Sequence, residues 1–209
     1  MKRMFLILSS IVLIINTITG QDDYQKIENF NRNTWGWEEF SRKGASAIIQ
    51  DGKLMLSVNP TSVPIGFFAS FAISEPTLST MANFPVDVTR NFRITYKFVA
   101  PKLKKSSLFI GTSGLRFELG QKLFTIANNE TSVKEKIALD KMLKDSGGKI
   151  EVIVTKSGKK ISCSVNGMTL GTIDTMLVSN KWTIGLIAFG KASVEVDEII
   201  IDQATEEDY

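Results

Sequence analysis

The sequence predicts an all-β protein in which two antiparallel sheets pack face to face, and three observations lead to this fold class. Apolar residues occur in short runs of Val, Ile, Phe, Leu and Thr between Gly, Asn, Asp and Pro. Two of the breaks, Asp51-Gly52 and Asn166-Gly167, are dipeptides that favour two-residue hairpin turns. No stretch after residue 20 shows the long 3.6-residue periodicity of a crossover helix, so the strands should follow one another antiparallel.

Fourteen runs have the composition of strands, and one segment predicts a short helix. Residues 138–145 are expected to form two helical turns that end at Gly147-Gly148. Ser74–Arg90 is predicted to be a loop, because Pro76 and Pro85 would interrupt a central strand. The predicted strands are 25–30, 45–50, 53–58, 65–73, 92–99, 106–111, 114–119, 122–127, 132–138, 150–156, 159–165, 168–173, 182–189 and 193–202.

The segment 150–173 predicts a three-stranded meander whose register follows from its turns. Two-residue loops at Ser157-Gly158 and Asn166-Gly167 sort nearly every apolar side chain onto one face. Cys163 is on that face and is therefore expected to be a buried thiol. In this register Ile150, Val152 and Val154 lie opposite Val165, Cys163 and Ile161, with Met168 and Leu170 on the same face.

The N-terminus has the pattern of a secretory signal peptide. Lys2 and Arg3 precede an apolar stretch over residues 4–15, and the small Gly20 follows. That stretch is shorter than the roughly 20 apolar residues needed to span a bilayer. We therefore predict a signal peptide over residues 1–20, a single sandwich domain over 21–203 and an acidic tail over 204–209. The mature protein is expected to be secreted or periplasmic, with no membrane span.

Composition excludes several kinds of site. The chain has no histidine and one cysteine, so a Ser-His-Asp triad, a histidine zinc site and an internal disulfide are all absent. The formal net charge is +3, but removal of Lys2 and Arg3 leaves 23 basic and 22 acidic residues. A nucleic-acid partner normally needs a concentrated positive face, so none is predicted.

Several short segments together resemble a known superfamily. They are Phe30-Asn31 with Trp35, then 51–56, 165–167, 182–186 and 196–201. In order and spacing these segments resemble the concanavalin A-like lectin/glucanase superfamily, in its laminin-G-like, jelly-roll form. The resemblance implies a jelly-roll sandwich, a fold that serves lectins, hydrolases and non-catalytic interaction domains.

The glucanases of this superfamily carry Glu-x-Asp on one strand with a second Glu two or three positions further on. The nearest string here is Glu195-Val196-Asp197-Glu198, in which the second Glu follows Asp197 directly. The apolar phase also shifts after Val196, which predicts a β-bulge near Asp197-Glu198. We therefore assign no catalytic residue. The enzyme alternative is a glycoside hydrolase with an atypical acid pair.

Tryptophan next to outward polar residues indicates carbohydrate binding. In Trp35-Gly36-Trp37, the resemblance places Trp35 in the core and leaves Trp37 to stack on a sugar. The predicted ligand-binding residues are Trp37, Arg93, Lys97, Arg116 and Glu118. The predicted function is that of an exported, non-catalytic, lectin-like protein with a polysaccharide or cell-surface glycan as partner. A protein–protein or adhesion domain on the same scaffold is the other alternative.

No cofactor is predicted to be required. The resemblance does imply a structural Ca²⁺ between the first and last strands, and Ca²⁺ takes six to eight oxygen ligands. The predicted metal ligands are Glu28, Asn29, Asp197 and Asp202.

Overall fold

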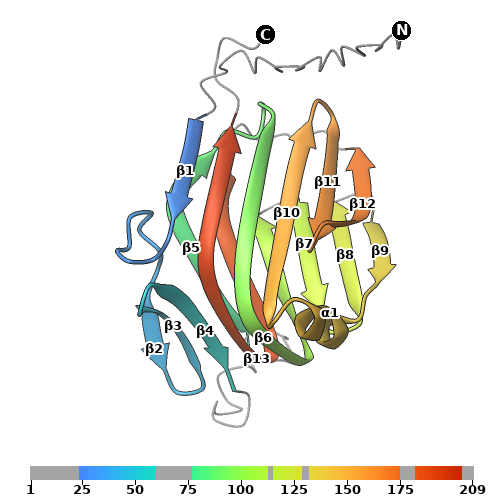
Figure 1. Ribbon diagram of the computed structural model, residues 1–209. Coiled ribbons are helices and arrows are strands. Elements are labelled where there is room, and N and C mark those ends of the chain that lie inside the picture. The colour runs from blue at the N-terminus through green and yellow to red at the C-terminus, as the bar shows by residue number, and fades with distance from the viewer. Residues whose placement is uncertain (1–23, 60–76, 113–114, 129–131, 175–181, 204–209) are drawn as a thin grey trace, which may run out of the picture.

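The computed structural model describes residues 24–59, 77–112, 115–128, 132–174 and 182–203, and it confirms the antiparallel sandwich (Figure 1). All strand pairs within these ranges are antiparallel. The predicted strand 65–73 lies outside the described residues. Within the described ranges, no helix is both long and apolar enough to cross a bilayer.

The elements follow the predicted order, but β2 and β5 were not predicted, and β6 and β13 each join two predicted strands. The predicted helix is α1 (Leu139–Asp145), and the strands are β1 (Tyr24–Glu28), β2 (Phe40–Arg42), β3 (Ala45–Gln50), β4 (Lys53–Val58), β5 (Thr77–Val86), β6 (Phe92–Thr112), β7 (Leu115–Gly120), β8 (Leu123–Asn128), β9 (Ser132–Lys136), β10 (Lys149–Ser157), β11 (Lys160–Val165), β12 (Met168–Asp174) and β13 (Trp182–Gln203).

Two long strands, β6 and β13, run through both sheets. The first sheet has the order β12-β11-β10-β6-β13-β1 and uses residues 92–99 of β6. The second has the order β9-β8-β7-β6-β13-β5 and uses residues 102–112 of β6. Figure 1 shows β7, β8 and β9 behind β10, β11 and β12. The separate strands predicted at 92–99 and 106–111 are thus one bent strand.

The core fills the space between the sheets because alternate residues of each strand point inward. Ile94 and Phe98 of the first sheet and Phe117 and Ile126 of the second are all buried in one cluster. At Gly171 of β12 the backbone approaches β9 closely, since a Cβ there would lie 2.9 Å from Cγ1 of Val133. The two sheets are therefore in close contact where β12 crosses β8 and β9.

The predicted meander is present, but one of its two turns is displaced. Val165 lies opposite Met168 around Asn166-Gly167, as predicted, although Met168 is 48% exposed at the rim. On the other side Ser157 lies opposite Lys160, so the turn is Gly158-Lys159. The register of β10 was therefore wrong by two residues, with Val152, Val154 and Lys156 opposite Val165, Cys163 and Ile161. A shift of two keeps each side chain on its face, so the predicted core residues are buried.

The longer hairpin turns Lys156 toward the core. Its side chain is 7% exposed, and Nζ donates to the carbonyl oxygens of Thr89 at 3.1 Å and Arg90 at 3.2 Å. Burial lowers the pKa of Lys156 from its ordinary value, and the nearby Asp87 carboxylate acts in the opposite direction. The ammonium thus holds the loop before β6 at the end of the sandwich.

Two further expectations concern backbone irregularities. The bulge predicted near Asp197-Glu198 is confirmed, because β13 shifts register between Val196 and Glu198. The loop predicted over 74–90 is wrong in part, because it contains β5. Proline is tolerated there because β5 pairs with β13 alone among the described strands, and the register shifts beside Pro85.

Cys163 is 1% exposed, and burial raises the pKa of its thiol. We expect Cys163→Ser to lower the free energy of unfolding by about 1–3 kcal/mol, because it places a hydroxyl in an apolar layer. Urea unfolding measures this loss. A thiol reagent should leave the native protein unlabelled and label the unfolded one, and full labelling of native Cys163 would contradict its burial.

Candidate functional site

Trp37 is part of the core and is not a surface residue. Its side chain is 2% exposed, and its ring lies 6.0 Å from the ring of Phe30 between centroids. Trp35 is also buried, at 6% exposed. Gly36 between them has a φ of +65°, so the chain turns there and the alternation of a strand does not apply. The expectation that Trp37 stacks on a sugar is therefore wrong.

A buried carboxylate organises the loop that carries both tryptophans. Glu28 is 0% exposed, and its Oε2 accepts the Trp35 backbone N–H at 2.8 Å and the Thr34 hydroxyl at 2.9 Å. Its Oε1 accepts the backbone N–H of Phe30 at 3.1 Å. Glu28 thus acts as an internal cap for the loop, and both of its oxygens are engaged by hydrogen-bond donors.

The four predicted metal ligands are not brought together. Glu28 lies opposite the buried Ile199, whereas Asp202 lies three residues further along β13 and accepts a hydrogen bond from Gln25 at 2.7 Å. Three residues of strand span about 10 Å, and Asp202 points to the outer face because Ile201 beside it is buried. Among the described residues, no group of three His, Cys, Asp or Glu side chains could hold a metal. The predicted calcium set was therefore wrong as a set.

The Glu-x-Asp string of β13 is divided among ion pairs. Glu195 accepts a hydrogen bond from Lys53 at 2.9 Å, and this bond raises the pKa of the lysine. Glu198 pairs with Lys97, and Asp197 occupies the bulge between the two glutamates. A glycosidase of the paired-carboxyl type needs one protonated and one ionised carboxyl group. Here both glutamates are ion-paired with lysine, which is unlike such a pair.

The four charged residues predicted to bind ligand lie on opposite sides of the sandwich. Arg93 and Lys97 belong to the part of β6 in the first sheet, and they alternate with buried Ile94 and Phe98. Their side chains therefore point to the outer face of the first sheet. Arg93 lies in one cross-strand row with Asp202 and Thr155. This face cannot share a site with β7.

Arg116 and Glu118 lie together on the outer face of the second sheet. They alternate along β7 with Phe117 and Leu119, which are 1% and 0% exposed. Arg116 is exposed and stands between two small residues, Gly111 of β6 and Ala127 of β8. Glu118 is half-buried opposite Thr125 of β8. Two of the five predicted ligand-binding residues are thus neighbours, on a surface that we call the β7 face (Arg116 and Glu118). The residues opposite them on β8, Ala127 and Thr125, are each 4% exposed and so offer little surface of their own.

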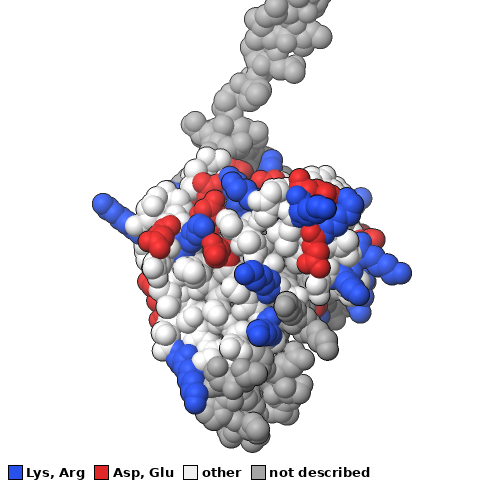
Figure 2. Space-filling model, turned by 60° about the horizontal axis from the view of Figure 1, so that its bottom comes forward, with Lys and Arg blue, Asp and Glu red and all other residues white. Residues whose placement is uncertain are grey.

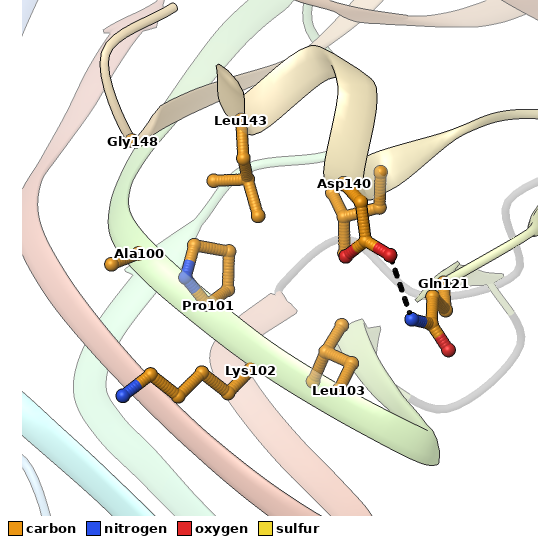
Figure 3. A pocket seen from close by; sticks show the side chains of 9 residues that line it. Ala100, Pro101, Lys102, Leu103, Gln121, Asp140, Leu143 and Gly148 are labelled. Carbon is orange, nitrogen blue, oxygen red and sulfur yellow. Dashed lines mark hydrogen bonds between the residues drawn. The ribbon is translucent and has the colours of Figure 1, made fainter.

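A pocket at one end of the sandwich was missed by the sequence analysis (Figure 3). It has a volume of about 320 Å³ and lies between α1, the bend of β6 and the turn that joins β7 to β8. Gln121 and Asp140 are the polar residues joined there by a hydrogen bond. Their positions, far apart in the sequence and in different elements, give no local signal.

Charge on the surface is mixed. Figure 2 shows Lys and Arg interspersed with Asp and Glu over the upper part of the visible face, whereas the described surface below carries a few separate Lys and Arg side chains among uncharged residues. This distribution differs from the concentrated positive stripe of nucleic-acid-binding proteins.

Comparisons with known proteins place the fold. No protein-family model and no curated protein sequence matches the chain. The carbohydrate recognition domain of Emp47p matches with a TM-score of 0.57 and 12% identity, over 88% of this chain and 96% of that one. The carbohydrate recognition domain of Emp46p, in a potassium-bound form, matches with a TM-score of 0.52 and 12% identity, over 79% of this chain and 87% of that one. A prokaryotic β-1,3-1,4-glucanase (lichenase) derived from a mouse hindgut metagenome matches with a TM-score of 0.56 and 14% identity, over 85% of this chain and 98% of that one. At these low identities, the TM-scores above 0.5 establish a shared fold.

Proposed function

We propose, from the premise that this chain has the fold of the concanavalin A-like lectins and glucanases, that it is an exported, non-catalytic carbohydrate-binding protein. Similar structures include carbohydrate recognition domains and a glucanase, which supports a carbohydrate as the ligand class. We assign binding to the β7 face. The partner is a polysaccharide or a cell-surface glycan.

The position of Arg116 and Glu118 side by side on the outer face of β7 is the observation that carries the proposal. A guanidinium offers up to five N–H donors and a carboxylate two acceptor oxygens, so the pair can engage neighbouring sugar hydroxyls of either polarity. The residues opposite Arg116, Gly111 and Ala127, carry no side-chain atom beyond Cβ, and Arg116 itself is exposed to a ligand. A ligand on this face meets directional polar groups.

The acid residues of β13 favour binding over hydrolysis. Glu195 and Glu198 are each engaged by a lysine ammonium, and the bulged Asp197 separates them along the strand. Neither the β7 face nor this string provides the pair of free carboxyl groups, 5 to 10 Å apart, that glycosidases of this type use. Calcium held by Glu28, Asn29, Asp197 and Asp202 is not part of the proposal.

Affinity on an open surface should be modest, with a Kd of about 10⁻⁴ to 10⁻⁵ M, which corresponds to about −5.5 to −7 kcal/mol. Arg116→Ala is expected to weaken binding at least about tenfold, because it removes the charged donors that hold the sugar. A glycan array on the purified protein identifies the ligand, and calorimetric titration then measures the Kd of each variant.

Arg93→Ala is the matched control, since it removes an arginine from the outer face of the other sheet. It should leave the Kd within about twofold, and both variants should keep the melting temperature of the parent protein. If Arg93→Ala abolishes binding while Arg116→Ala does not, the site is on the first sheet. Steady release of reducing sugar from the bound glycan would establish a hydrolase instead.

Export is the remaining part of the proposal. Lys2, Arg3 and the apolar stretch 4–15 support cleavage close to Gly20. Intact-mass measurement on protein recovered from an exporting host should show an N-terminus near Gln21. A mature product that still contains residues 4–15 would contradict this prediction.

A further inference from the structure

The pocket beneath α1 is assembled from three separate segments. β6 bends between the sheets at Ala100-Pro101, where Ala100 has a φ of +41° and donates its N–H to the carbonyl of Gly148 at 2.6 Å. The turn after β7 is joined to the start of α1, because the N–H of Leu139 donates to the carbonyl of Gln121 at 3.1 Å. The pocket of about 320 Å³ between them is therefore tied by backbone hydrogen bonds on both sides.

Most of the pocket wall is apolar. Leu103 and Leu139 are 3% and 1% exposed, and Pro101 is buried as well. In Figure 3, Leu143 of α1 points toward Pro101 across the pocket, and Leu103 lies on the β6 side. A volume of about 320 Å³ is at the lower end of the range for small-molecule sites, about 300–1,000 Å³. The pocket thus accommodates a ligand of one or two rings with an apolar face.

A carboxylate and an amide form the polar side of the pocket. Nε2 of Gln121 donates to Oδ2 of Asp140 at 3.0 Å, which holds the two side chains together, as the dashed line in Figure 3 shows. A carboxylate accepts about four hydrogen bonds and an amide oxygen two, so Oδ1 of Asp140 and Oε1 of Gln121 can accept from ligand hydroxyls. A purely apolar ligand would desolvate these two acceptor oxygens without offering them a hydrogen bond.

Charge balance narrows the ligand class further. Asp140 and Lys102 are the charged residues of the lining and have opposite signs, and Lys102 directs its Nζ away from Asp140 (Figure 3). An anion would be repelled by the Asp140 carboxylate, and a cation that pairs with Asp140 would be desolvated by the apolar walls. A neutral ligand with an apolar face and several hydroxyls fits the walls and the polar side together.

We infer that this pocket binds a single neutral sugar residue, with its C–H face against Pro101 and Leu143 and its hydroxyls on Asp140 and Gln121. The left-handed backbone of Ala100 is consistent with a site, because a non-glycine residue rarely adopts that conformation without a compensating role. This site is separate from the β7 face, and neither site depends on the other.

Methyl-group NMR on the purified protein tests the inference. Methyl glycosides of glucose, galactose and mannose are titrated into protein labelled at the leucine methyls, each at millimolar concentration. At least one glycoside should shift the methyl signals of Leu103, Leu139 and Leu143. Asp140→Asn should weaken that binding about tenfold, because it replaces an acceptor oxygen by a donor. Leu143→Phe should also weaken it, by filling the pocket.

Asp145→Asn is the matched control, since it makes the same chemical change on α1 at a residue that does not line the pocket and that pairs with Lys141. It should leave the binding unchanged, and so should Arg116→Ala. The inference is overturned if no glycoside shifts the three leucines, or if hexylamine shifts them and the glycosides do not. Loss of pocket binding in Arg116→Ala would overturn the separation of the sites. If a glycan binds at the β7 face but no leucine methyl signal shifts, the inference about the pocket is wrong and the proposed function stands.

Discussion

Trp37→Ala should lower the free energy of unfolding by about 3–5 kcal/mol, because it empties a space filled by an aromatic side chain that is 2% exposed. The cavity would open beside Phe30, itself 1% exposed, and the loop over 29–39 would lose one of its two indole anchors. Urea unfolding monitored by circular dichroism measures the change in midpoint.

Trp37→Phe separates packing from hydrogen bonding. Nε1 of Trp37 is buried and has no hydrogen-bond partner among the described residues, so phenylalanine removes an unsatisfied donor as well as part of the ring. These effects oppose each other, and we expect the free energy of unfolding to change by less than about 1.5 kcal/mol. An unchanged unfolding midpoint in Trp37→Ala would show that the indole is not a core element, and would restore it as a candidate for ligand binding.

Glu28→Ala should destabilise the protein to a similar degree, lowering the free energy of unfolding by about 3 kcal/mol or more. Three donors lose a charged acceptor at once, and the buried backbone N–H groups of Phe30 and Trp35 are left unpaired. Glu28→Gln should also destabilise, because an amide presents one acceptor and places N–H donors against the donors that remain.

Glu39→Ala is the control for Glu28→Ala. Glu39 also accepts two hydrogen bonds, from the backbone N–H of Ile49 at 2.9 Å and from Nδ2 of Asn33 at 3.3 Å, but its side chain is exposed. Because Glu39 is exposed, water can replace the lost acceptor, so Glu39→Ala should lower the free energy of unfolding by less than about 1 kcal/mol. Equal unfolding midpoints for the two variants would contradict a structural role for the burial of Glu28.

Local sequence was sufficient where a short-range rule decides the structure. Asn166-Gly167 alone places Val165 opposite Met168, because both turn residues tolerate positive φ, and Asn166 has a φ of +47°. The alternation of apolar residues predicts that Cys163 is buried, and its shift after Val196 predicts the bulge in β13. These features depend on neighbours within a few residues of the chain.

Contacts between distant segments decided the rest. Ser157-Gly158 and Gly158-Lys159 are both acceptable turns locally, and the structure has the one in which Lys156 reaches the carbonyls of Thr89 and Arg90. β5 is a strand because β13 pairs with it, although Pro85 argues against a strand locally.

The same limit applies to the candidate sites. Alternation along the chain predicts that Arg93 and Arg116 point away from the core, and both do. It does not say which sheet each residue joins, because β6 passes through both sheets and its partners come from residues far along the chain. Trp37 and Glu28 became buried for a related reason, since the loop between them turns on Gly36 and packs inward.

The sequence by itself determined which residues form strands and which side chains alternate inward, because both depend on local backbone preference. Only the tertiary structure decided which outward residues share a face, because strand pairing joins segments that no local rule connects.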